Sequence, residues 1–316
     1  MILADYFRSE KTLEWDIAKQ CGVEHGVIRL PETKDFDVTS LSHWQTVHKN
    51  FTDFGIKPII IEPMPNELHD HIKSGDEKRD ECIEKAIKML PIMDKLDIRT
   101  ICFNFMAHIG WLRTSSKIEE RGGAFVTGFN INDFKPIEAA ITKEQLWANY
   151  EYFIKAIMPY ADKYNIKLAL HPDDPPLDNL GNVARIMTSY ENINKAVNMY
   201  KSDNLGVTMC QATYLMMGED LEHVIKELKD KIFFVHFRNA RGNKLKFNET
   251  FHDNGKIEMA KLLKYYHSLG IDVPIRVDHV PAMAGDSDTS GYGNIGRLFA
   301  IGYLKGILEA VEGRKK

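Results

Sequence analysis

Four residues of metal-ligand type stand at the ends of short apolar segments in the second half of the chain. They are His171 in LALHPDDPP, Cys210 in LGVTMC, His236 in FFVHFRN and Asp278 in PIRVDHV. Any one of them taken alone is more often structural, because buried polar side chains are usually satisfied by hydrogen bonds. Four such residues on consecutive strands favour one shared cation if those strands are neighbours in a parallel barrel.

The mixed donor set indicates the kind of cation and the chemistry that it would support. Thiolate and imidazole ligands favour a transition metal over Mg²⁺ or Ca²⁺, and they leave Zn²⁺, Fe²⁺, Mn²⁺ and Co²⁺ open. A metal with an open coordination position suits the removal of a proton beside a carboxylate or carbonyl group, because the cation stabilises the resulting enolate.

Other polar residues near these strand ends are candidates for supporting roles. We expect Asp173, Asp174 and Asn239 to orient the ligating rings. The expected substrate-binding residues end strands, follow His236 or lie in a loop, and they are Glu62, Asn104, Arg238, Asn239 and His252.

Two further residues are candidates for general acid and base catalysis. His279 adjoins Asp278, and Tyr292 lies in the glycine-flanked segment SGYGN. The structural alternatives are that His279 only supports Asp278 and that Tyr292 is a packed loop aromatic. A paired acid and base is what the elimination of a hydroxyl group requires.

Eight short segments rich in β-branched and aromatic residues alternate with longer amphipathic segments along the whole chain. The expected strands are residues 3–8, 26–31, 58–64, 100–106, 167–173, 205–210, 233–239 and 274–280. The expected helices are residues 38–53, 77–96, 143–164, 189–200, 220–231, 256–270 and 296–312. Pro91 is expected to kink or end the second helix. This alternation predicts an α/β protein with a (β/α)8 TIM barrel, and a doubly wound sheet is the alternative.

The chain contains no linker or low-complexity segment, so we expect residues 1–316 to form a single TIM-barrel domain. Long irregular stretches follow four of the expected strands, at about 107–140, 172–188, 240–255 and 281–295. In a TIM barrel these segments are loops of the C-terminal face, where active sites are built.

Composition and missing motifs argue against several other classes of protein. A hydrophobic content of 44% is typical of a globular protein. A net charge of −4 gives no indication of a basic surface that would bind nucleic acid. No apolar segment approaches the roughly 20 residues that cross a membrane, and no signal peptide is evident, so we expect a cytoplasmic protein. The four cysteines form no CxxC pair and are expected to be reduced. GxGxxG, P-loop and GxSxG motifs are absent.

The motifs CFNFM, WLRT, LALHPDDPP, VHFRN, RVDH and GYG resemble those of the mannonate dehydratase family in order and spacing. The resemblance implies a xylose-isomerase-like TIM barrel that dehydrates D-mannonate to 2-keto-3-deoxy-D-gluconate. It also implies Mn²⁺, with Fe²⁺ or Co²⁺ as alternatives, and a homo-oligomer, a dimer. Carried over by position, the family's metal ligands and its acid/base pair fall on His171, Cys210, His236 and Asp278, and on His279 and Tyr292.

This chain departs from the family pattern in segments expected to contact the substrate. YFRSE and IRLPETKD stand where the family usually has FRWYG and a strand ending in Ala-Leu-His. Gly110 and Leu112 flank the motif tryptophan, and Val280 and Pro281 follow the Asp-His pair, in place of the usual residues. Which aldonate is the substrate therefore stays open.

Two other functions compete with a dehydratase. A divalent-metal sugar isomerase or epimerase of the xylose-isomerase-like barrels also needs a cation and a base beside an acidic carbon. A non-catalytic sugar-acid-binding protein is disfavoured, because binding alone does not require a Cys/His/Asp metal constellation. A dehydratase must also protonate a leaving hydroxyl group, and His279 or Tyr292 would serve this step.

Overall fold

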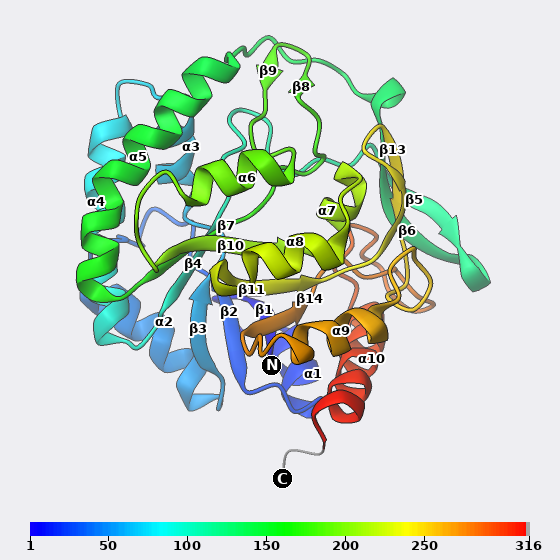
Figure 1. Cartoon of the computed structure of the whole chain (residues 1–316). Helices are drawn as coiled ribbons and strands as arrows, with labels where there is room; N and C mark the ends of the chain where they lie inside the picture. The colour runs from blue at the N-terminus through cyan, green and yellow to red at the C-terminus, as the bar shows by residue number, and fades with distance from the viewer. Residues whose placement is uncertain (314–316) are drawn as a thin grey trace.

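Eight parallel strands close into a barrel in the computed structural model, which describes residues 1–313 (Figure 1). Around the barrel the strand order is β1–β14–β11–β10–β7–β4–β3–β2, and β1 closes the sheet by pairing with both β14 and β2. The strands are β1 (Ile2–Arg8), β2 (His25–Arg29), β3 (Lys57–Ile61), β4 (Thr100–Phe103), β7 (Lys167–Leu170), β10 (Leu205–Cys210), β11 (Ile232–Phe237) and β14 (Pro274–Val277).

Helices form a layer outside the strands (Figure 1). They are α1 (Leu13–Gln20), α2 (Leu41–Asp53), α3 (Asn66–Ser74), α4 (Arg79–Lys95), α5 (Lys143–Tyr164), α6 (Tyr190–Val197), α7 (Gln211–Met217), α8 (Leu221–Leu228), α9 (Met259–Ser268) and α10 (Asn294–Glu312). Their apolar faces pack on the barrel to form the main core, while Ala4, Val27, Ile60, Cys102 and Phe234 fill part of its interior. In residues 1–313 no helix is both long and apolar enough to cross a membrane.

The closed barrel confirms the predicted fold class, and the doubly wound alternative is wrong. All eight expected strands are present within a few residues of their expected ends. The seven expected helices are also present, although α4 continues through Pro91 rather than ending there. Helices α1, α3 and α7 were not expected, and residues 314–316 of the expected domain lie outside the described part of the chain.

Two of the segments expected to be irregular instead form a four-stranded antiparallel sheet, here called the accessory sheet. Its order is β12–β13–β6–β5, with β5 (Ser115–Glu120) and β6 (Ala124–Asn130) from one loop and β12 (Ala240–Asn243) and β13 (Lys246–Glu249) from another. In Figure 1 the strands of the accessory sheet lie at one side of the barrel. The loop after β14 joins it, because Phe125 and Ala282 exchange backbone hydrogen bonds of 3.0 and 2.8 Å. A short pair, β8 (Asn179–Leu180) with β9 (Val183–Ala184), occupies a third loop.

The accessory sheet has a hydrophobic cluster of its own against α7 and the loop after β7. Phe129 and Phe247 meet with ring centroids 5.9 Å apart, and Leu180 and Met216 belong to the same cluster. This packing fixes β13 against the end of the barrel, so the end of the strand is held close to the loops of the C-terminal face.

We predict that Phe247→Ala lowers the free energy of unfolding by ~3 kcal/mol, because it leaves a cavity in this small cluster. Leu245→Ala, in the same hairpin at a side chain that is 51% exposed, is the matched control and should change stability by less than about 0.5 kcal/mol. Urea denaturation of both variants checks this. Equal effects of the two substitutions would show that the cluster does not stabilise the sheet.

Candidate metal and acid/base site

A cavity of about 540 Å³ opens at the C-terminal ends of the barrel strands. It is lined by polar and charged side chains from several strands and the loops that follow them. Those residues include eight that the sequence singles out: Glu62, Asn104, His171, His236, Arg238, Asp278, His279 and Tyr292. This is the face on which TIM-barrel enzymes carry their active sites.

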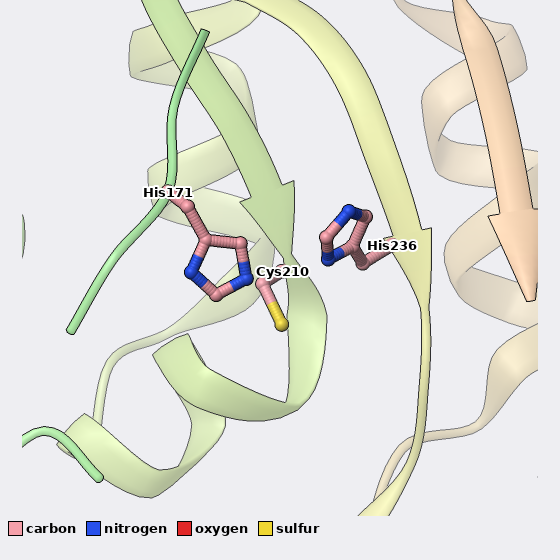
Figure 2. A group of neighbouring side chains, drawn as sticks. All are labelled: His171, Cys210 and His236. Atoms are coloured by element: carbon pink, nitrogen blue, oxygen red, sulfur yellow. The ribbon is translucent and has the colours of Figure 1, made fainter. Parts of the chain in front are cut away.

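Three of the four predicted metal ligands converge beside this cavity. One donor atom each from His171, Cys210 and His236 lies within 4.8 Å of the other two. Figure 2 shows the two imidazole rings on either side of the Cys210 thiol, with the cysteine at the tip of β10 and His236 on β11. The centroids of the two rings are 5.0 Å apart, and Cys210 is fully buried.

The two histidines differ in how free their ring nitrogens are to bind a cation. Nδ1 of His171 lies 2.6 Å from the carbonyl oxygen of Pro172 and donates to it, so Nε2 keeps its lone pair. Burial and the nearby Arg238 lower the pKa of His171, which favours the neutral, metal-binding form. His236 is also buried, and its Nε2 lies 3.0 Å from Oε1 of Glu62, while its Nδ1 lies 3.6 Å from Oδ2 of Asp278. Two imidazoles and a thiol with this pattern fit a divalent transition metal.

Asp278, the fourth predicted ligand, stands at the edge of this group. Its Oδ2 is 3.6 Å from Nδ1 of His236, while its Oδ1 accepts a hydrogen bond of 2.9 Å from Arg276. Against the effect of burial, His279 and Arg276 hold the pKa of Asp278 well below its usual range, so the carboxylate is ionised. In this geometry Asp278 is therefore an ion-pair partner at the margin of the donor group.

A second group of potential ligands, Glu62, Cys102 and His236, lies deeper in the barrel. Its carboxylate is already engaged, because Arg276 donates two hydrogen bonds of 2.9 Å to Glu62. Burial and the neighbouring Glu62 raise the pKa of the Cys102 thiol, which disfavours the thiolate form that binds metals. The group containing Cys210 is therefore the better candidate for the metal.

Beside the metal group, His279 and Tyr292 form a hydrogen-bonded pair. Nε2 of His279 is 3.1 Å from the Tyr292 hydroxyl, and the two rings meet edge to face. Burial, with the charge of Asp278, raises the pKa of Tyr292, so its hydroxyl is protonated at neutral pH. The ring of Trp111 lies against His279, with centroids 4.7 Å apart. The structure thus brings the two predicted acid/base residues together in the cavity.

Buried arginines surround this pair. Arg113 donates two hydrogen bonds to Asp174, of 2.7 and 2.9 Å, and Arg238 donates a third, of 2.8 Å. Both arginines also contact Glu249, at the end of β13. Burial opposes the ionisation of Glu249, but Arg113 and His279 outweigh it and lower its pKa to about 2.

Several residues that were predicted to have supporting roles have other partners in the structure. Asp173 accepts hydrogen bonds from the backbone of residues 186 and 187, and Asp174 binds the two arginines, so neither orients a ligating ring. Asn239 is buried and bonds to the backbone at residues 240, 252 and 257. His252 is fully buried, stacks on Phe237 and bonds to its carbonyl oxygen at 2.8 Å, away from the cavity lining. Both side chains are thus engaged with the main chain, and their predicted substrate-binding roles stay predictions.

Sequence reasoning missed four residues that shape the site: Trp111, Arg113, Glu249 and Arg276. Three of them lie inside motifs quoted above, WLRT and RVDH, and Arg276 stands two residues before the predicted ligand Asp278, which was an available signal. Glu249 lies in a segment expected to be an irregular loop, and only the pairing of β13 with β6 brings it to the barrel.

His252 yields a prediction about stability. Burial lowers its pKa to about 4, whereas an unfolded histidine titrates near 6.5. Between these values the unfolded chain binds the extra proton, so the free energy of unfolding falls as the pH decreases from about 6.5 to 4, by ~3 kcal/mol from this group. His252→Gln should show a shallower decrease in urea denaturation over this range, with KM unchanged. An identical pH dependence in both proteins would contradict the assignment.

Comparison with known proteins identifies the family of this chain. The model of the D-mannonate dehydratase (UxuA) family matches residues 1–141 and 131–316. The chain is 31% identical to the mannonate dehydratase of Brachyspira hyodysenteriae, covering 92% of both chains, and 32% identical to mannonate dehydratase 2 of Halalkalibacterium halodurans, covering 83% of this chain and 85% of the relative.

Solved structures agree with the sequence relatives. The mannonate dehydratase of Streptococcus suis serotype 2 superposes with a TM-score of 0.88 at 28% identity, covering 98% of this chain and 93% of that one. A D-psicose 3-epimerase from Clostridium cellulolyticum H10 matches with a TM-score of 0.64 at 13% identity, covering 98% and 99% of the two chains, and shares only the fold. With a matching family model along its whole length, the chain belongs to the D-mannonate dehydratase family and is a hydro-lyase.

Proposed function

We propose that this protein dehydrates D-mannonate, or a closely related aldonate, to a 2-keto-3-deoxy acid. We propose that the reaction uses a divalent metal ion, with Mn²⁺ as the first candidate. The observation that carries the proposal is the position of the His171, Cys210 and His236 group beside the His279–Tyr292 pair. An epimerase does not need to protonate a leaving hydroxyl group, so the paired acid and base favour dehydration. The cytoplasmic location and the homodimer stay predictions.

The reaction removes a proton from C2 and a hydroxyl group from C3. The C2 proton is only weakly acidic, and a bound divalent cation supplies stabilisation for the negative charge that develops on the substrate carboxylate. His171, Cys210 and His236 would hold this cation, and we propose Asp278 as the fourth ligand. Nε2 of His171 keeps its lone pair because Nδ1 donates to the Pro172 carbonyl oxygen, which suits this task.

His279 and Tyr292 divide the proton transfers between them. The protonated Tyr292 hydroxyl suits the donation of a proton to the departing C3 hydroxyl, which leaves as water. His279 suits the removal of the C2 proton. Because Nε2 and the hydroxyl are 3.1 Å apart, the proton gained by His279 can return to Tyr292, which restores both groups for the next cycle.

The remaining polar residues of the cavity differ in how free they are to bind the substrate. Asn104 uses its carbonyl oxygen for the backbone N–H of Met106, which leaves its amide N–H groups for substrate hydroxyls. Arg238 and Glu62 line the cavity, but each already has a charged partner. We therefore propose Asn104 as a direct substrate contact and assign Arg238 and Glu62 mainly to the charge balance of the site.

The direct test is to incubate the purified protein and Mn²⁺ with D-mannonate and to measure formation of 2-keto-3-deoxy-D-gluconate. Other aldonates tested in parallel would identify a different substrate of the same reaction. The proposal predicts a 2-keto-3-deoxy product that requires the metal. Conversion of a sugar acid into an epimer without loss of water would contradict it.

We predict that Cys210→Ala lowers the metal content of the purified protein to well below one ion per chain, because one of three converging donors is lost. Cys102→Ala removes the thiol of the competing ligand group and should leave the metal content unchanged. Metal analysis by plasma mass spectrometry measures both. Loss of metal in the Cys102 variant but not in the Cys210 variant would place the cation in the deeper group.

We also predict that Tyr292→Phe lowers kcat by ~10²-fold or more with the metal still bound, because only the proton-donating hydroxyl is removed. Tyr6→Phe is the control, since Tyr6 lines the same cavity with its ring centroid 6.1 Å from that of Tyr292, and it should lose less activity. Steady-state kinetics and metal analysis of both variants test this prediction. Near wild-type turnover in Tyr292→Phe would exclude it as the proton donor.

A further inference from the structure

We infer that Glu249 is a positioning residue that fixes the ring orientation and the tautomer of the catalytic histidine His279; the inference rests on the proposed function of His279. Glu249 is the last residue of β13, so the accessory sheet rather than the barrel supplies this group. Oε1 of Glu249 lies 2.5 Å from Nδ1 of His279, and both side chains are buried.

Glu249 is itself held from two sides. Its Oε2 accepts a short hydrogen bond from the Thr127 hydroxyl on the neighbouring strand β6. Its Oε1 accepts from Nη2 of Arg113 at 2.5 Å and from Nε of the same residue at 3.2 Å. A carboxylate with partners on both oxygens has little freedom to rotate, so it presents a fixed acceptor to the imidazole ring.

The contacts of Nδ1 determine which tautomer is present. Nη1 of Arg238 also lies 2.9 Å from Nδ1, and a hydrogen bond from this arginine would require a lone pair there. An ionised carboxylate 2.5 Å away would then face a lone pair and repel it. Because Glu249 is ionised, Nδ1 must carry the proton and donate it to Oε1, while Arg238 is left with its 3.3 Å contact to the same carboxylate.

The tautomer of His279 decides whether its Nε2 atom can accept a proton. In the neutral ring with its proton on Nδ1, Nε2 of His279 has a lone pair directed at the Tyr292 hydroxyl, as a general base requires. The backbone reinforces this orientation, since His279 has a φ of +36°, in a region that L-residues rarely adopt, and Val280 bonds to the Gly291 carbonyl at 2.7 Å. Without Glu249, Arg238 would favour the opposite tautomer, with the proton on Nε2.

Asp174 provides a matched control for this role. Like Glu249 it is a buried carboxylate bound to both Arg113 and Arg238, but it has no hydrogen bond to His279. Glu249→Asp keeps the negative charge and withdraws the carboxylate by one methylene group. Asp174→Asn removes a charge from the same arginines and leaves the contact with His279 in place. The two variants therefore separate positioning from charge balance.

The experiment measures kcat, KM and the His279 tautomer in both variants. The tautomer is read from long-range ¹H–¹⁵N correlation spectra of the full chain loaded with diamagnetic Zn²⁺, with His279→Gln used to assign the signals. In Glu249→Asp we expect kcat to fall ~10- to 100-fold with KM within about threefold, and the proton to move to Nε2. In Asp174→Asn we expect the wild-type tautomer and a smaller loss of kcat.

Two results would overturn the inference. One is a Glu249→Asp variant with wild-type kcat and tautomer. The other is an Asp174→Asn variant that matches the kcat and tautomer changes of Glu249→Asp, since Glu249 would then act only as a charge partner of the arginines. If the wild-type protein does not dehydrate D-mannonate, the proposed function fails, but the spectra still test whether Glu249 sets the tautomer.

Discussion

Buried ion pairs at the C-terminal end of the barrel are the interaction on which the rest of the site depends. Arg276 binds Glu62 and Asp278, and Arg238 binds Asp174, so carboxylates that would otherwise be costly to bury stay ionised. Removing one partner of such a pair typically costs 3–5 kcal/mol, because it leaves an unpaired charge out of water. The positions of the metal-binding and acid/base side chains are therefore coupled to this network and to the strands that carry it.

The fold was largely readable from the sequence, because buried parallel strands are nearly continuous apolar runs. Strands such as β10 and β11 are buried at every residue, and their sequences LGVTMC and IFFVHF carry that signal. The accessory sheet was not readable, since β5 (SSKIEE) and β12 (ARGN) are polar and half-exposed. The hairpins β5–β6 and β12–β13 form one sheet only through the pairing of β6 with β13, which lie more than a hundred residues apart in the sequence, and local pattern does not encode this.

The candidate site was predictable where function needs a particular residue type at a strand end. His171, Cys210 and His236 could be chosen because imidazole and thiol groups at strand tips in a barrel share one end. The roles of the neighbouring polar residues were not predictable, because they depend on the partner that each finds. His252 has the residue type of a substrate contact but is stacked in the core, whereas Glu249 reaches the site only through the accessory sheet.

The central claim is that the thiolate of Cys210 and the imidazoles of His171 and His236 bind one cation. X-ray absorption at the zinc edge of the Zn²⁺-loaded protein tests it most directly, since sulfur and nitrogen ligands scatter at different distances. The account predicts one sulfur at ~2.3 Å together with nitrogen or oxygen ligands at ~2.0–2.2 Å. A first coordination shell made only of nitrogen and oxygen atoms would contradict it.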